Sequence, residues 1–134
     1  MARQQINSNQ QKKPFVTSQI GTQTSGAKQF PGFTGYGFSC NSPYTTIVCN
    51  MSGVYTIMAR QLLSTNANQI YFRITVNGSE VATSYPPPNT GTRDTLTWCT
   101  VSLNAGDSIQ VVQSNSVNTA WAGSHSSFTI TRIA

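Results

Sequence analysis

The side chains able to do acid–base or nucleophilic chemistry are few and scattered. The chain has one histidine, His125, and three acids, Glu80, Asp94 and Asp107. A catalytic triad would need His125 beside Asp94 or Asp107 and an activated serine, but the sequence has no nucleophile-elbow pattern. The acids show no paired spacing suited to general acid–base catalysis. We therefore interpret His125 as a turn histidine and expect no enzymatic activity.

The three cysteines, Cys40, Cys49 and Cys99, do not form a metal-binding pattern. Together with the single histidine they match no zinc-ligand spacing. The glycine-rich stretch 30–38 lacks the following helix of a phosphate-binding loop. We expect no metal ion and no cofactor. Cys40 and Cys49 could lie on neighbouring strands around the turn at 41–43, either as a disulfide or as two buried thiols.

Charged residues make up only 8% of the chain, against about 25% in ordinary globular domains. Neutral hydroxyl and amide side chains take their place, which allows subunits to pack closely with little electrostatic repulsion. The length of 134 residues fits one domain. The N-terminus has no apolar run of signal-peptide length, and no segment approaches a membrane span. We expect synthesis in a reducing cytoplasm and no membrane partner.

The net charge of +5 is concentrated at the N-terminus, because residues 1–30 contain cations and no acid. Apolar residues are scattered through this segment without a helical period. We predict that 1–30 is an extended basic arm that anchors the protein to its neighbours. Its cations and apolar anchors are Arg3, Lys12, Lys13, Phe15, Val16, Ile20, Lys28 and Phe30. A solvated leader with no partner is the alternative.

From residue 45 onward, apolar and polar residues alternate with period two, as in half-buried strands. The alternation is clearest over 54–60, 70–76, 97–103, 109–111 and 128–130. Asn77-Gly78 is a strong hairpin signal, and no segment has a helical pattern. The sequence predicts an all-β, antiparallel jelly-roll sandwich over 31–134.

Large apolar residues also occupy outward positions of these strands: Met58, Tyr71, Trp98 and Val112. Single exposed apolar residues are normal, but outward positions of central strands are usually polar. We interpret the four residues together as a subunit interface.

Two loops contain aromatic residues that could meet a receptor. Tyr85, Pro86 and Pro87 begin a proline-rich run that could bind a small recognition domain or stiffen the connection between strands. Trp121, close to His125, could stack on a sugar ring or pack in a core or an interface.

The order of these features resembles a known family. The series consists of Gly53-Val54-Tyr55, Val76-Asn77-Gly78, a Leu-x-x-Gly-Asp-x-Ile element from Leu103 to Ile109, and Ser127-Phe128. It is similar to the trimeric jelly roll of tumour necrosis factor and of complement-type globular heads. The resemblance covers residues 45–133 and implies a homotrimer. It departs from the family after the last aromatic residue, where Thr129 and Ile130 replace the usual glycine.

Jelly rolls of this kind also occur in viral and phage structural proteins, and a basic arm suits that setting. The leading hypothesis is a virion structural protein, a phage capsid decoration or cement protein that trimerises and binds the major capsid protein through its arm. One alternative is a receptor- or glycan-binding module at a spike or fibre tip, with loops 85–89 and 120–125 touching the host receptor. Another is a capsid subunit whose arm contacts nucleic acid, although its cations are few for that.

Overall fold

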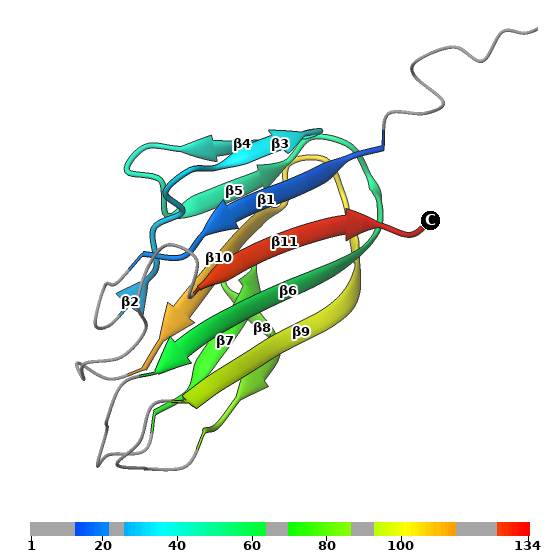
Figure 1. Ribbon diagram of the computed structural model, residues 1–134. Helices are drawn as coiled ribbons and strands as arrows, with labels where there is room; N and C mark the ends of the chain where they lie inside the picture. Colours follow the sequence, from blue (N-terminus) through cyan, green and yellow to red (C-terminus); the bar gives the residue numbers. More distant parts are fainter. Residues whose placement is uncertain (1–12, 22–25, 64–69, 87–92, 115–125) are drawn as a thin grey trace, which may run out of the picture.

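The computed structural model describes residues 13–21, 26–63, 70–86, 93–114 and 126–134. In these residues the regular structure is entirely β-strand, arranged as two antiparallel sheets that face each other (Figure 1). The predicted all-β antiparallel sandwich is confirmed. Over the same ranges, no helix has the length and hydropathy needed to cross a membrane.

Sheet A, the front layer in Figure 1, has the strand order β3-β1-β11-β6-β9. Its strands are β1 (Phe15–Gln19), β3 (Thr34–Tyr36), β6 (Gly53–Leu63), β9 (Arg93–Leu103) and β11 (Ser127–Arg132). The two longest strands, β6 and β9, pair along their whole length, from Gly53 opposite Leu103 to Leu63 opposite Arg93. This ladder is the longest pairing in the described structure and fixes the register of the sheet.

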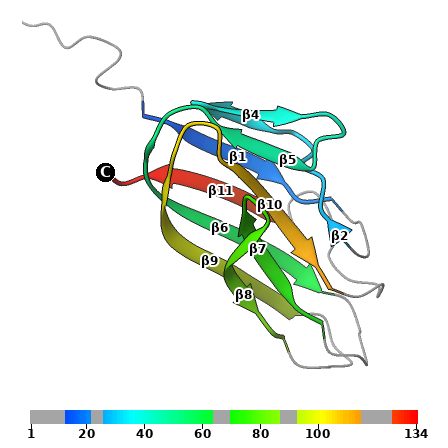
Figure 2. The same ribbon diagram turned by 180° about the vertical axis from the view of Figure 1, so that it is seen from behind.

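Sheet B has the strand order β4-β5-β10-β7-β8, and the short β2 also pairs with β10. Its strands are β2 (Gly26–Ala27), β4 (Phe38–Asn41), β5 (Thr46–Cys49), β7 (Phe72–Val76), β8 (Ser79–Ser84) and β10 (Ser108–Gln113). Figure 2 shows this layer from behind, with β10 and β7 at its centre. The chain crosses repeatedly between the sheets after β5, so the two layers are interleaved in sequence.

The core lies between the inner faces of the two sheets. Ring contacts cross it: the Phe38 and Tyr55 ring centroids are 5.1 Å apart, and those of Phe30 and Phe128 are 4.8 Å apart. Most of the inward residues that the alternation predicts are buried, namely Tyr55, Ile57, Ala59, Ile70, Phe72, Ile74, Thr97, Leu103, Ile109, Val111, Phe128 and Ile130. Val76, Cys99 and Val101 are partly buried and pack against the same core. The period-two alternation therefore identified the inner faces correctly.

The predicted Asn77-Gly78 hairpin joins β7 to β8, and both residues have positive φ, 52° and 82°. This matches the backbone that a tight hairpin turn requires. Asp107 ties this turn to the β9–β10 turn: its carboxylate accepts from the Asn104 amide at 2.8 Å and from the Asn77 side-chain amide at 2.9 Å. These two hydrogen bonds lower the pKa of Asp107. Side-chain hydrogen bonds thus join two turns that lie far apart in the sequence.

The predicted boundary at residue 30, between an arm and a domain, is wrong. β1 lies inside sheet A, where Val16 is opposite both Gly35 of β3 and Ile130 of β11. Val16 and Ile20 are completely buried. The domain therefore includes β1, and of the predicted arm only residues 1–12 remain, which lie outside the described ranges.

The glycine-rich stretch 30–38 does not form one continuous strand. It turns at Pro31-Gly32, forms β3, and then passes to β4 in the other sheet. Gly37 lies at this passage with a φ of 77°. A Cβ atom there would be 2.9 Å from the Pro14 Cβ, so both the backbone angle and the packing require glycine.

Two adjacent positions of β1 distinguish a core strand from an arm. Val16→Ala removes a fully buried side chain, so we expect a loss of about 2 kcal/mol in the free energy of unfolding. Thr17→Ala changes an exposed position of the same strand and should cost less than about 1 kcal/mol. Urea unfolding followed by tryptophan fluorescence measures both. Equal and small effects would show that β1 is not part of the cooperative fold.

Candidate functional site

The outer face of sheet A is built from the outward positions of five paired strands. One row across the sheet contains, in strand order, Thr34, Thr17, Thr129, Met58 and Trp98. The neighbouring row contains Tyr36, Phe15, Thr131, Thr56 and Thr100. We call these two rows, together with Leu96, the sheet A face. Both rows consist only of hydroxyl-bearing and apolar side chains.

The apolar part of this face is centred on β6 and β9. Met58 and Trp98 lie directly opposite each other in the ladder, and Leu96 is the next outward residue on β9. Trp98 is 57% exposed, Leu96 46% and Met58 38%. Aromatic residues and methionine are enriched at protein–protein interfaces. Three exposed apolar side chains in contact range of one another form a patch that a partner could cover.

Threonines surround this patch. Thr56 and Thr100 pair across β6 and β9 with their hydroxyl oxygens 3.2 Å apart. Thr129 of β11 is opposite Met58 of β6 on one side and Thr17 of β1 on the other. Their methyl groups and hydroxyls give a low, uncharged surface without long side chains. Such a surface loses little side-chain entropy when a partner packs against it.

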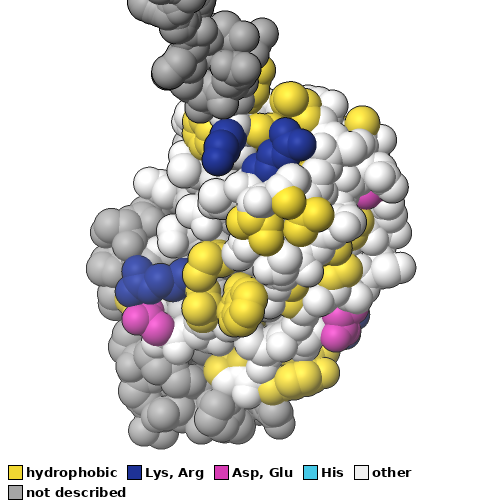
Figure 3. Space-filling model, turned by 90° about the vertical axis from the view of Figure 1, so that its right-hand side faces the viewer, with side chains coloured by type: hydrophobic (Ala, Val, Ile, Leu, Met, Phe, Trp, Pro, Cys, Tyr) yellow, Lys and Arg dark blue, Asp and Glu magenta, His cyan; other side chains and the backbone are white. Residues whose placement is uncertain are grey.

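Two of the charged residues beside the face, Arg60 and Asp94, form an ion pair. Arg60 and Asp94 lie on outward positions next to Leu96, with a nitrogen–oxygen distance of 3.0 Å. Both side chains are about half exposed, so the pair adds little to stability. Its effect is to cancel charge at the margin of the apolar patch. Figure 3 shows hydrophobic side chains in patches on a mostly uncharged surface.

The four residues predicted as one interface are divided between two faces. Met58 and Trp98 belong to the sheet A face, whereas Tyr71 precedes β7 and Val112 is on β10, both in sheet B. The Tyr71 ring contacts the Tyr85 ring, with centroids 5.7 Å apart. Tyr71 and Val112 are also only partly exposed. One flat interface cannot contain all four residues, because they lie on the outer faces of two different sheets. The sequence grouped them because period-two alternation does not tell which sheet a strand joins.

Among the exposed large apolar residues of the face, sequence reasoning missed two, Leu96 and Phe15. Leu96 is about half exposed and is the outward residue of β9 next to Trp98. Extending the predicted alternation by one step toward the start of β9 would have identified it. Phe15, assigned to the arm, is an outward residue of β1 with 37% exposure. The signal was weak, because Phe15 and Val16 are both apolar and the three residues after them are polar.

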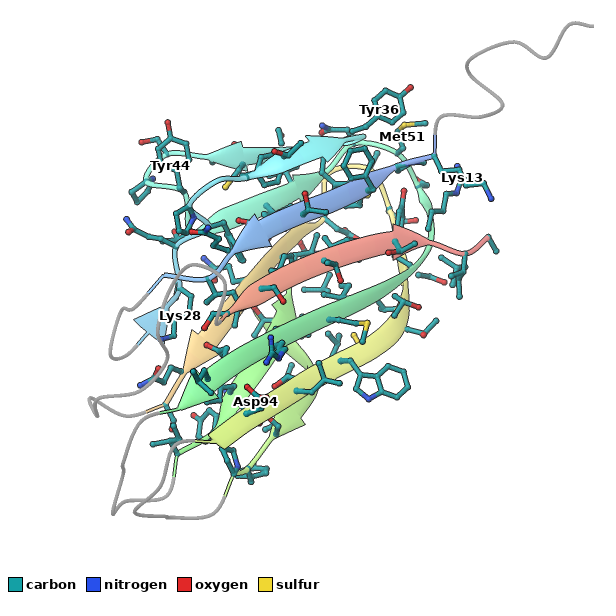
Figure 4. All side chains as sticks on the ribbon, in the orientation of Figure 1. Lys13, Lys28, Tyr36, Tyr44, Met51 and Asp94 are labelled. Carbon is teal, nitrogen blue, oxygen red and sulfur yellow. The ribbon has the colours of Figure 1, made fainter. Side chains whose placement is uncertain are left out.

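The other predicted arm residues do not form one anchoring segment. Val16, Ile20 and Phe30 are core residues, and Lys28 is completely buried, so none of these four can anchor the protein to a separate partner. Lys13 is exposed at the start of β1 (Figure 4). Arg3 and Lys12 lie outside the described residues.

The predicted receptor loops are only partly within the described structure. Tyr85 is 59% exposed and its neighbour Pro86 is buried. Pro87, Trp121 and His125 lie outside the described ranges, so the structure does not place them relative to Tyr85.

The acids and cysteines take structural positions in the described chain. Glu80 is 3.5 Å from the Arg73 guanidinium, Asp94 pairs with Arg60, and Asp107 links two turns. Cys40, Cys49 and Cys99 are free thiols, which agrees with the alternative of unpaired cysteines. Over the described ranges, no three metal-ligating side chains come close enough to hold an ion.

One end of the interior is polar. Lys28, Gln61, Gln113 and Ser126 are buried there. The Lys28 ammonium lies 5.8 Å from the centroid of the Phe72 ring, and burial lowers the pKa of Lys28 from 10.5 to about 8. The Gln61 side-chain amide has no hydrogen-bond partner in the structure as described. The core is therefore less stable at this end than its apolar centre.

Comparison with protein-family models gave no match for this chain. Comparison with curated proteins gave no relative either.

Lys28 makes stability depend on pH in a defined direction. Between pH 8 and pH 10.5 the unfolded lysine is protonated more than the folded one, so the free energy of unfolding rises with pH over that window. Lys28→Met removes a buried charge and should raise this free energy by roughly 1–3 kcal/mol at pH 7, with a smaller gain at pH 10.5.

Urea unfolding of both proteins at pH 7 and at pH 10.5 measures the effect. The exposed Lys13→Met is the matched control and should change stability little at either pH. A gain from Lys28→Met that is equal at the two pH values would contradict the lowered pKa.

Proposed function

We propose that this chain is a non-enzymatic structural subunit of a virion, most simply a capsid decoration protein. In this proposal it assembles as a homotrimer through the sheet A face and binds the shell with residues 1–12. The observation that carries the proposal is the uncharged sheet A face, with Trp98, Leu96 and Met58 exposed at its centre.

The strand order supports the jelly-roll part of the proposal. Strands β5, β7, β8 and β10 belong to sheet B, while β6, β9 and β11 belong to sheet A. The chain thus alternates between the layers, as a jelly roll requires. The resemblance to the trimeric family of tumour necrosis factor and complement-type heads leads us to expect three copies rather than two.

The composition of the face favours self-association over binding to a charged partner. Stable interfaces bury about 800 Å² on each partner, and two rows spanning five strands can supply much of that area. The central rows have no charge, so a second copy meets no like-charge repulsion there. A buried Trp98 would be the main anchor, because tryptophan is enriched among residues that dominate binding energy.

The remaining arm supports attachment to an acidic partner. Residues 1–12 carry Arg3 and Lys12 and no acid, and the exposed Lys13 continues this basic segment up to β1. Ordering such a segment costs about 1–2 kcal/mol per residue. Attachment is therefore favourable where several arms of one trimer bind together.

A matched pair of variants tests the trimer. Trp98→Ser on the sheet A face should convert the trimer to monomer at micromolar concentration without lowering the monomer's stability. Tyr71→Ser removes an aromatic residue from sheet B and should leave the mass unchanged. Native mass spectrometry and sedimentation velocity measure the oligomer. A trimeric Trp98→Ser protein, or a Tyr71→Ser monomer, would place the interface elsewhere.

The attachment role requires a separate test. Deletion of residues 2–12 keeps β1 intact and should reduce binding to purified particles at least tenfold, with the trimer preserved. Quantitative mass spectrometry against the major shell protein gives the copy number. We expect a simple fraction of the shell subunits for the full chain. Full occupancy by the shortened chain would refute attachment through the arm.

A second candidate function rests on Tyr85. This exposed ring contacts Tyr71, whose ring lies 4.3 Å from the Arg73 guanidinium carbon. Aromatic faces next to an arginine can bind sugar rings or a receptor peptide, so this cluster favours the receptor-binding alternative over the nucleic-acid alternative. A copy number that fits only vertices or a tail would support it.

A further inference from the structure

A pocket lies beside β3 and β4, the edge strands of the two sheets. Its volume is about 420 Å³, which is within the usual range for small-molecule sites. Its described lining consists of the segment 29–33, Cys40 of β4, and Tyr44 in the β4–β5 turn. None of the interface residues discussed above lines it.

The lining selects against charge. Phe33 and Tyr44 provide aromatic rings, Pro31 an aliphatic ring and Cys40 a thiol. The Phe30 side chain is only 1% exposed and belongs to the core behind the pocket. No described lining residue carries a formal charge. A charged ligand would lose its hydration there without gaining an ion-pair partner. An uncharged ligand with an apolar ring would contact the aromatic rings at no such cost.

Hydrogen bonds fix the walls before any ligand arrives. The Phe30 amide donates to the Tyr44 carbonyl at 2.9 Å, and the Gln29 side-chain amide donates to the Pro43 carbonyl at 3.1 Å. The buried Phe30 ring packs against the ring of Phe128 in the core, which fixes the position of the segment 29–33. The turn and the segment 29–33 are therefore fastened together, so that the pocket is preformed.

Tyr44 is an unusual residue for its backbone position. Its φ is 71°, a region that bulky residues rarely adopt. Its side chain is nevertheless 56% exposed, and Figure 4 shows it at the β4–β5 turn, directed away from the sandwich. Glycine would form this turn without strain. Strained residues of this kind cluster at ligand sites, and core packing does not account for the ring.

We propose that this pocket binds a small uncharged ligand with an apolar ring, between benzene and indole in size. Phe33 contacts the ring, and Tyr44 closes the rim. The site is independent of the proposed assembly function, because it uses none of the residues of the sheet A face.

The test uses the full chain and indole as the probe. Indole should bind with a dissociation constant of about 1 mM or tighter, and amide resonances of residues 29–33, 40 and 44 should shift in two-dimensional NMR. Tryptamine, which adds a cationic tail to the same ring, should bind at least tenfold more weakly. Absence of saturable shifts with indole, or equal binding of tryptamine, would overturn the proposal.

Substitutions at the rim locate the site. Tyr44→Gly removes the ring and relieves the backbone, so the thermal midpoint should stay equal or rise while indole affinity falls at least tenfold. Ile133→Gly removes an exposed apolar side chain outside the pocket and should leave indole affinity unchanged. Should Tyr44→Gly fail to fold, Cys40→Leu fills the same pocket from β4 and should also weaken binding tenfold. Unchanged affinity in the folded pocket variants would refute the assignment.

Discussion

The insertion of β1 between β3 and β11 is the constraint on which the rest of the sandwich depends. Its inward Val16 and the buried Ile20 directly after it complete the core, and its backbone joins β3 to the sheet. Its outward side chains, Phe15 and Thr17, extend the sheet A face to five strands. Because one short strand supplies the core, the sheet and the face together, the segment before the predicted domain is essential to the domain itself.

Only 8% of the residues are charged, and in the described structure one of them, Lys28, lies in the interior. The described acids are each engaged by an arginine or by turn amides, whereas a lysine is buried at one end of the interior. The sheet A face remains neutral and hydroxyl-rich. Short-range contacts therefore determine what can associate with this face, and long-range electrostatic attraction contributes little.

The fold class and most inward residues could be predicted from the sequence, because alternation over long strands such as β6 is a strong signal. The role of residues 15–20 could not, since a six-residue segment with Ser18 on its inner side resembles an arm. The site was half predicted: Trp98 and Met58 were identified, but Tyr71 and Val112 were grouped with them. Strand order across two sheets depends on pairing between distant segments, which a local pattern does not contain. The pocket at Tyr44 gave no local signal at all, because a positive φ at a tyrosine depends on hydrogen bonds to residues 29–30.

The alternation in β9 assigns two separate roles, packing and association, to alternate residues of one strand. Thr97 and Leu103 face the core, and Leu96 and Trp98 face outward. Packing of the core therefore restricts the side chain at every second position of this strand only. The outward residues determine what the face can bind, while the inward residues hold the two sheets together. Association through the sheet A face can therefore be altered at Leu96 or Trp98 without rebuilding the core.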